Sequence, residues 1–180
     1  STPLLYAEDR GYGAAAEVLI SAKANVNARD GYGKSALHYA VHHGHSAAVR
    51  MLIDAKASVN ANASSDAKIS IYDKNRECAT PLHEAAVFGR SANVQVLLNA
   101  KADIDVKDKS GKTPLHWAVT PGQGSNDFLE GASNDTGRRA VSRFLVAAKA
   151  DLNIKDDKGQ TPLFVAVMHD RSAFVQDLIA

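Results

Sequence analysis

Cysteine is almost absent from this chain, because Cys78 is the only one among 180 residues. A single cysteine excludes an internal disulfide, and such sparse use of cysteine is typical of proteins from reducing compartments. We therefore expect a cytoplasmic location, with the nucleus as the alternative.

Long apolar runs and an excess of charge are also lacking. No segment approaches the roughly 18 to 20 apolar residues of a membrane-spanning helix, so we expect no membrane partner. Lysine and arginine number 21 and aspartate and glutamate number 20, which leaves a formal net charge of +1. A chain this close to neutral gives no general reason to expect nucleic acid as a partner.

The sequence lacks a convincing catalytic set as well. No Ser–His–Asp arrangement, pair of catalytic carboxylates or nucleophile–base pair can be assigned to a shared pocket. Gly111, Lys112 and Thr113 resemble the end of a phosphate-binding loop, but that motif needs a glycine where Val106 stands. We therefore predict no catalytic residue, no enzymatic activity and no cofactor.

Two groups of possible metal ligands favour structural roles. The aspartates of segment 103–108 are spaced somewhat like a calcium loop, but lysines occupy other ligand positions of that motif. His42, His43 and His45 lie close in sequence, yet no carboxylate or cysteine stands at a helical spacing from them. We predict no metal site, so an enzyme or metal protein using these histidines is the least favoured class.

What the sequence does contain is a repeated phrase. Segment 108–119 joins a polar, glycine-containing turn to a helix start, because the Thr113 side chain can cap a helix and Pro114 suits its first turn. Leu115, Ala118 and Val119 then give that helix a narrow apolar face, against which another helix can lie closely. Copies of this helix start occur at Thr2, Ser35, Thr80, Thr113 and Thr161.

The copies are regularly spaced. Successive starts lie 33, 45, 33 and 48 residues apart, so two intervals equal 33 and the others are 12 and 15 residues longer. A second phrase, Ala-Lys-Ala, recurs downstream of the first four starts, with its lysines at Lys23, Lys56, Lys101 and Lys149. A period of 33 residues with Thr-Pro-Leu-His is typical of an ankyrin array. The chain resembles the ankyrin-repeat family over nearly its whole length.

The resemblance implies an all-α fold, an ankyrin-repeat solenoid of helix-turn-helix units with projecting β-hairpin fingers. In each repeat an inner helix follows the Thr-Pro start, an outer helix packs behind it, and a finger leads to the next inner helix. We expect a single domain over residues 1–180, with repeats at about 1–29, 30–74, 75–107, 108–155 and 156–180. Polar capping repeats are not evident, so we also expect flanking sequence.

Two insertions interrupt the period. The first, near residues 62–74, falls where a finger belongs and predicts a longer finger. The second, near residues 120–137, lies between the inner and outer helices of the fourth repeat and contains Phe128 and Leu129 as its only large apolar residues. Because the insertions join different pairs of helices, we expect them on opposite edges of the solenoid.

The recurring lysines are a departure from the family pattern. Family members usually carry glycine at this position after the outer helix, where the backbone is left-handed. A non-glycine residue there costs about 1 kcal/mol or more, while a cation at a helix C-terminus recovers about 0.3–1 kcal/mol. We predict that the two effects nearly cancel.

The resemblance implies a protein–protein interaction module that binds a protein or peptide on the concave face, formed by finger tips and inner helices. An acidic partner is weakly favoured, because the finger tips carry more basic than acidic residues. We expect a monomer. The predicted contact residues, of which Val87 and Phe88 are the sharpest pair, are Arg29, Tyr32, Lys34, His42, His43, Arg76, Val87, Phe88, Lys109, Lys112, Lys158, Met168 and His169.

Two alternatives stay open at this point. Ankyrin arrays are often fused to other domains, so this array could instead be the targeting or regulatory segment of a larger enzyme or channel. Val87 and Phe88 could equally be packing residues that the first insertion covers.

Overall fold

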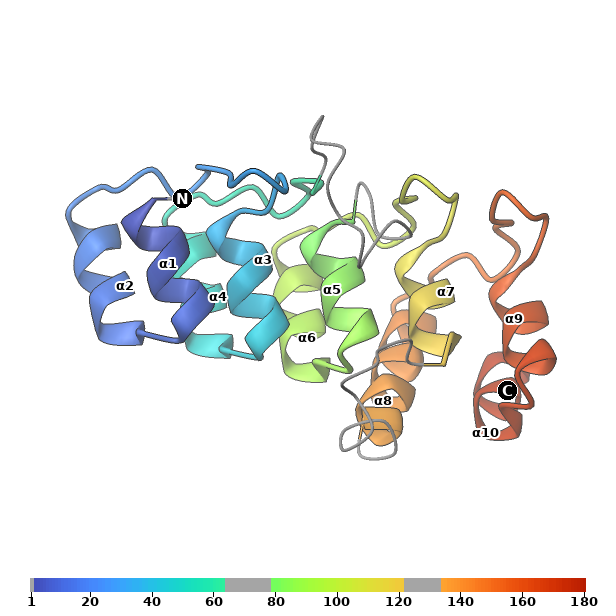
Figure 1. The fold of residues 1–180 in the computed structure, drawn as a ribbon. Coiled ribbons are helices and arrows are strands. Elements are labelled where there is room, and N and C mark those ends of the chain that lie inside the picture. Colours follow the sequence, from blue (N-terminus) through green and yellow to red (C-terminus); the bar gives the residue numbers. More distant parts are fainter. Residues whose placement is uncertain (1, 64–78, 122–133) are drawn as a thin grey trace.

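The computed structural model describes residues 2–63, 79–121 and 134–180, which form a row of helix pairs (Figure 1). Each pair contains one inner and one outer helix, as the sequence predicts, and this confirms the all-α solenoid. The inner helices are α1 (Pro3–Arg10), α3 (Ala36–His43), α5 (Pro81–Val87), α7 (Pro114–Val119) and α9 (Pro162–Met168). The outer helices are α2 (Gly13–Ser21), α4 (Ser46–Asp54), α6 (Ser91–Asn99), α8 (Asn134–Ala147) and α10 (Ser172–Ile179).

The inner helices begin where the repeated phrase predicts. Thr2 caps α1 by accepting a hydrogen bond from the Leu5 amide at 3.3 Å, and proline occupies the first turn of that helix. At Thr80 a capping box forms, in which the histidine three residues later accepts a hydrogen bond from the Thr80 amide. The Thr-Pro-Leu-His phrase therefore acts as a helix start.

The helix ends also follow the sequence. Gly11 and Gly44 end α1 and α3 in the left-handed conformation, with φ of 71° and 79°. The recurring lysines follow the outer helices with positive φ as well, which confirms the left-handed backbone expected of them. These lysines are Lys23, Lys56, Lys101 and Lys149, with φ of 60°, 68°, 65° and 65°.

Replacing Lys101 with glycine is expected to leave the melting temperature unchanged or to raise it slightly. Glycine removes a left-handed penalty of about 1 kcal/mol, while the lost charge at the helix C-terminus costs about 0.3–1 kcal/mol. Thermal unfolding of the two chains at matched ionic strength checks this. A clear drop in melting temperature would mean that the Lys101 side chain has a specific partner.

The core runs continuously between the two layers of helices. Each inner helix packs on the inner helices of its neighbouring repeats, and the outer helices do the same. Leucines such as Leu37, Leu82 and Leu115 are buried, and Ala40 and Ala118 beside them are fully buried. Because alanine is small, neighbouring helices approach closely, and each repeat therefore depends on the next for its burial.

The fingers are held in shape mainly by hydrogen bonds to aspartate side chains, and less by strand pairing. Asp30 Oδ1 accepts hydrogen bonds from the Tyr32 and Lys34 amides at 2.8 and 2.9 Å. Asp108 and Asp156 make the same pair of bonds in the fourth and fifth repeats. Within the described residues, strand pairing is limited to isolated bridges, Arg29 with Ser35 and Ala63 with Ala79. Each aspartate therefore stabilises a tight turn locally.

Neighbouring fingers touch at Gly111. It has φ of 71°, and a Cβ placed there would lie 2.9 Å from the Asp157 backbone nitrogen. We expect Gly111→Ala to lower the free energy of unfolding by about 1–2 kcal/mol, from the left-handed backbone and the contact together. Gly159→Ala is the matched control, since Gly159 has φ of 74° and nothing lies within 4 Å of its added Cβ. Urea denaturation of both variants gives the comparison, and an equal loss in the two would contradict the proposed contact.

The fourth repeat departs from the predicted boundaries. Helix α8 begins at Asn134, inside the insertion expected near residues 120–137. Arg138 explains this earlier start, because its buried guanidinium donates a hydrogen bond to the Trp117 carbonyl at 3.2 Å and anchors the extra turn. Most of both insertions, with Phe128 and Leu129, lies outside the described residues, and so do the nearby Arg76 and Cys78.

No helix within the described ranges is both long and apolar enough to cross a membrane.

Candidate binding surface

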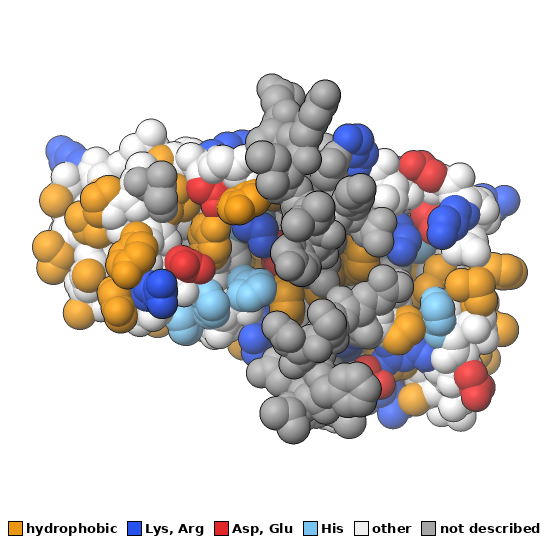
Figure 2. Space-filling view, in the orientation of Figure 1, with side chains coloured by type: hydrophobic (Ala, Val, Ile, Leu, Met, Phe, Trp, Pro, Cys, Tyr) orange, Lys and Arg blue, Asp and Glu red, His pale blue; other side chains and the backbone are white. Residues whose placement is uncertain are grey.

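The inner helices and the fingers together form one face of the solenoid, which we call the inner face. In Figure 2 this face shows apolar, basic, acidic and histidine side chains on both sides of the grey central residues. The contacts below show which of these side chains support the stack and which stay exposed.

Three histidines of the repeated phrase are structural. His38, His83 and His116 are all buried, and each Nδ1 accepts a hydrogen bond from the backbone amide at the helix start. Each Nε2 donates to a backbone carbonyl that precedes the next inner helix, at 3.2, 3.1 and 3.0 Å. They therefore link successive repeats and are not available to a partner.

Burial lowers the pKa of these histidines, because the charged imidazolium is disfavoured away from water. The pKa of His38 falls to about 4. The pKa values of His83 and His116 are lowered for the same reason. All three rings are therefore neutral at physiological pH, and this suits their role as one donor and one acceptor.

A buried ion pair joins the second and third repeats on the inner face. Lys34 Nζ lies 2.9 Å from Glu84 Oε1, and His42 Nδ1 lies 3.6 Å from Glu84 Oε2. The Glu84 side chain is 2% exposed, while Lys34 and His42 are 25% and 36% exposed. Burial opposes the ionisation of Glu84, but Lys34 and His42 outweigh it and hold its pKa well below the usual range.

Glu84 is a residue that the sequence reasoning missed. The equivalent positions in other repeats carry Tyr39 and Trp117, whose side chains donate hydrogen bonds to Asp30 and Asp108 of their own fingers, at 2.5 and 2.7 Å. A comparison of the repeats could therefore have indicated Glu84, because a carboxylate replaces an aromatic residue at this position of the third repeat. Trp117 is itself a packing residue, since it is buried in the core.

The two residues of the predicted pair, Val87 and Phe88, differ from each other in their exposure to solvent. Val87 is 7% exposed and belongs to the core. Phe88 is half-buried at the end of α5, and its ring lies 4.2 Å from that of His42. Val87 is therefore a packing residue of the core, whereas Phe88 retains a partly accessible ring beside Glu84.

His42 and His43 lie in an aromatic row along the inner face. Their rings are 4.9 Å apart, and His43 Nε2 lies 3.8 Å from Asp9 Oδ1 of the first repeat. Burial, followed by the proximity of His42, lowers the pKa of His43. The row connects the first three repeats across the inner face.

The remaining predicted residues are spread along the row of fingers and the last inner helix. Lys112 Nζ lies 4.5 Å from the centre of the Trp117 ring, and burial lowers its pKa. Arg29 reaches the next finger, where it donates a hydrogen bond to the Asn62 carbonyl at 2.7 Å. Tyr32 is 56% exposed at its fingertip. The other exposed members are Lys109, Lys158, Met168 and His169.

Metal ligation has no support in the described part of the chain, where no three or more His, Cys, Asp or Glu side chains are grouped to hold an ion.

Comparison with known families agrees with this architecture. A family model of ankyrin repeats in three copies matches residues 1–63 and 64–130, and a single ankyrin-repeat model matches residues 110–157. A comparison with curated proteins found no match. Ankyrin repeats are generally protein–protein interaction modules and are usually non-catalytic. The repeated helix starts, the paired helices and the family models together show that this chain belongs to the ankyrin repeat family.

Proposed function

We propose that this chain is a non-catalytic module that binds a protein or peptide partner on its inner face. The observation that carries the proposal is the contrast within that face. Histidines of the repeated phrase are buried and occupied by structural hydrogen bonds, whereas Tyr32 and Met168 on the same face are exposed. Such residues can contact a partner without cost to the solenoid.

The proposed contact is centred on Phe88 and the ion pair beside it. A partly accessible aromatic ring next to a buried charge pair is the kind of position where binding energy concentrates, because a partner that covers it completes its desolvation. Tyr32 on the neighbouring finger offers a second aromatic anchor. Lys34 lies between these elements and ties the finger of Tyr32 to α5, which keeps the two anchors in a fixed arrangement.

Charge favours an acidic partner. Lys109, Lys112 and Lys158 belong to neighbouring fingers, and Arg29 lies on an earlier one, so basic side chains recur along the edge of the inner face. Basic residues spread in this way mainly raise the association rate with an acidic partner, and salt screens the effect. Binding to such a partner should therefore weaken as ionic strength rises, and no salt dependence would contradict the acidic preference.

The test is affinity capture with the whole chain as bait, followed by measurement of Kd for each recovered protein. The inner-face variant Tyr32→Ala/Phe88→Ala is expected to raise Kd at least about tenfold. Arg50→Ala, an exposed change on outer helix α4, is the matched control and should bind like the unaltered chain. Partners that bind the double variant as tightly as the unaltered chain would overturn the inner-face assignment.

A further inference from the structure

The outer helix of the fourth repeat carries an apolar hollow on its solvent side. The hollow has a volume of about 530 Å³ and is lined by Thr136, Arg139, Ala140, Arg143, Phe144 and Ala147 of α8. Thr136, Ala140, Phe144 and Ala147 recur at helical spacing, so they form one stripe along the helix. Phe144 is 40% exposed although it is a large aromatic residue. This stripe faces away from the fingers and lies outside the inner face.

The stripe differs in part from the equivalent positions of the other central outer helices. Aligned on the recurring lysines, Phe144 and Ala147 correspond to Val96 and Asn99 in α6 and to Met51 and Asp54 in α4. The arginines of α8 correspond to serine and glutamine in α6 and to serine and arginine in α4. The equivalents of Ala140 and Phe144 in α4 and α6 are also apolar, so α8 differs in its larger and more exposed aromatic ring, in Ala147 and in carrying arginine at both positions.

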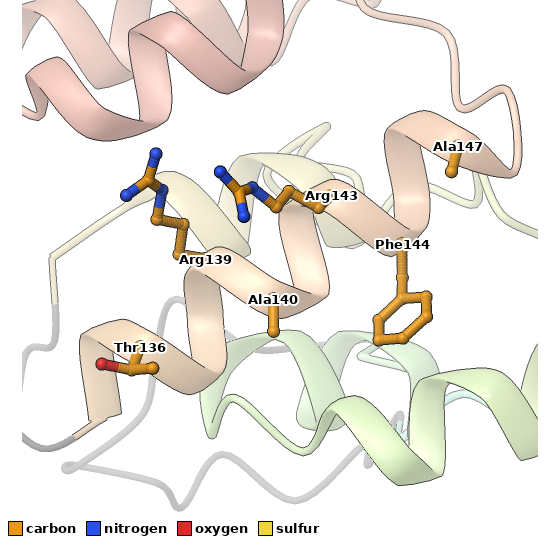
Figure 3. A pocket seen from close by; sticks show the side chains of 6 residues that line it. All are labelled: Thr136, Arg139, Ala140, Arg143, Phe144 and Ala147. Carbon is orange, nitrogen blue, oxygen red and sulfur yellow. The ribbon is translucent and has the colours of Figure 1, made fainter.

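A positive edge borders the stripe. In the close view, Arg139 and Arg143 extend along one edge of the hollow, while Ala140 and Phe144 point toward the other edge (Figure 3). Both arginines contact one carboxylate, with Arg139 Nη2 and Arg143 Nε at 3.1 and 3.0 Å from Asp177 Oδ1 on α10. The Asp177 side chain is 7% exposed, whereas that of Arg143 is 61% exposed. Two guanidinium groups on one buried carboxylate leave a positive charge facing solvent.

Among the residues that the structure describes, the charges around the hollow do not cancel this excess. The exposed side chains of α6 carry no acidic residue, and Asp135 at the start of α8 is paired with the buried Arg171. The hollow is therefore apolar along its length and positive along the edge toward α10. An occupant must match both features.

We propose that the outer face of α8 is a second docking surface, which takes an amphipathic helix of a protein partner with an apolar stripe and acidic residues along one side. The apolar stripe packs over Ala140, Phe144 and Ala147, in the manner of a helix laid in a groove. The acidic residues pair with Arg143 and Arg139, whose guanidinium groups are fixed in position by Asp177. This site is separate from the inner face, so one chain can hold two partners at once.

The proposal is tested by selection from displayed random peptides of about 16 residues, roughly the length of α8, on the whole chain. Peptides that also bind Phe144→Ser are removed. The retained peptides are expected to carry apolar residues at helical spacing with aspartate or glutamate on one flank. Their binding is measured by fluorescence anisotropy, and Arg143→Ala is expected to raise Kd at least about tenfold. Arg50 occupies the equivalent position on α4, so Arg50→Ala is the matched control and should leave Kd unchanged.

The outcomes separate this site from the inner face. Tyr32→Ala/Phe88→Ala should bind the selected peptides normally, and circular dichroism with thermal unfolding verifies that each variant is folded. The proposal is overturned if no peptide distinguishes the unaltered chain from Phe144→Ser, or if the retained peptides are basic. It is also overturned if sedimentation shows a dimer that Phe144→Ser dissociates, because a second copy of the chain would then occupy the surface.

Discussion

Replacing His83 with alanine is expected to lower the free energy of unfolding by about 3–5 kcal/mol. The ring is 1% exposed, so its removal leaves a cavity between the third and fourth repeats. The change also removes three polar contacts, from the Thr80 amide at 3.1 Å, the Thr80 hydroxyl at 3.0 Å and to the Lys112 carbonyl at 3.1 Å. The last of these is the link between repeats, so the loss acts on the junction as well as on the helix start.

Urea denaturation followed by circular dichroism measures this effect. His169→Ala is the matched control, because His169 follows an inner helix but is exposed, and its change should fall within about 0.5 kcal/mol. The variant is also expected to broaden the unfolding transition, since a weakened junction in a repeat array lets the two sides unfold separately. A loss below about 1 kcal/mol with an unchanged transition would show that the histidine is not the link described here.

The repeat architecture could be predicted because it depends on local chemistry. Thr80 and Pro81 start a helix through capping and a preset φ, and the period then places every other helix. The left-handed lysines could be predicted on the same basis, since the backbone conformation belongs to the position and not to the side chain. Boundaries were less certain where a contact from elsewhere decides them, as Arg138 does at the start of α8.

The candidate surface was harder to predict because it depends on pairs of residues from different repeats. Lys34 and Glu84 are 50 positions apart in the chain, yet their charged groups lie 2.9 Å apart. Val87 could not be placed by its type alone, since an apolar residue at a helix end can face either the core or a partner. A comparison of equivalent positions between the repeats would have drawn attention to Glu84 and to Glu8 without a structure.

Glu8 is the second carboxylate that differs in type from the residues at the equivalent position of other repeats. It lies in α1 at the position where the second and fourth repeats carry Val41 and Val119, and it is 1% exposed. Its Oε1 atom has no hydrogen-bond partner among the described residues. Burial raises the pKa of Glu8 to about 7, so this repeat contains an acid that is about half ionised near neutral pH.

Replacing Glu8 with valine is therefore expected to stabilise the chain by about 2–3 kcal/mol at pH 8 and by less at pH 5. Below pH 4.5, the usual pKa, both states hold the proton and ionisation costs nothing. Between pH 4.5 and about 7 the unfolded chain releases the proton while the folded chain keeps it, so stability falls as pH rises. Above about pH 7 the whole cost is present, and it stays constant.

The difference in unfolding free energy between Glu8→Val and the unaltered chain isolates this group across pH 4.5–8. The buried histidines also respond to pH, because their lowered pKa values reduce stability as pH falls below about 6.5, but they are present in both chains and cancel. Glu17→Val, which changes an exposed acid on the adjacent α2, is the matched control for the substitution itself. A flat difference for Glu8→Val would mean that the Glu8 carboxylate has a partner or water access in the folded chain, and that its ionisation carries no cost.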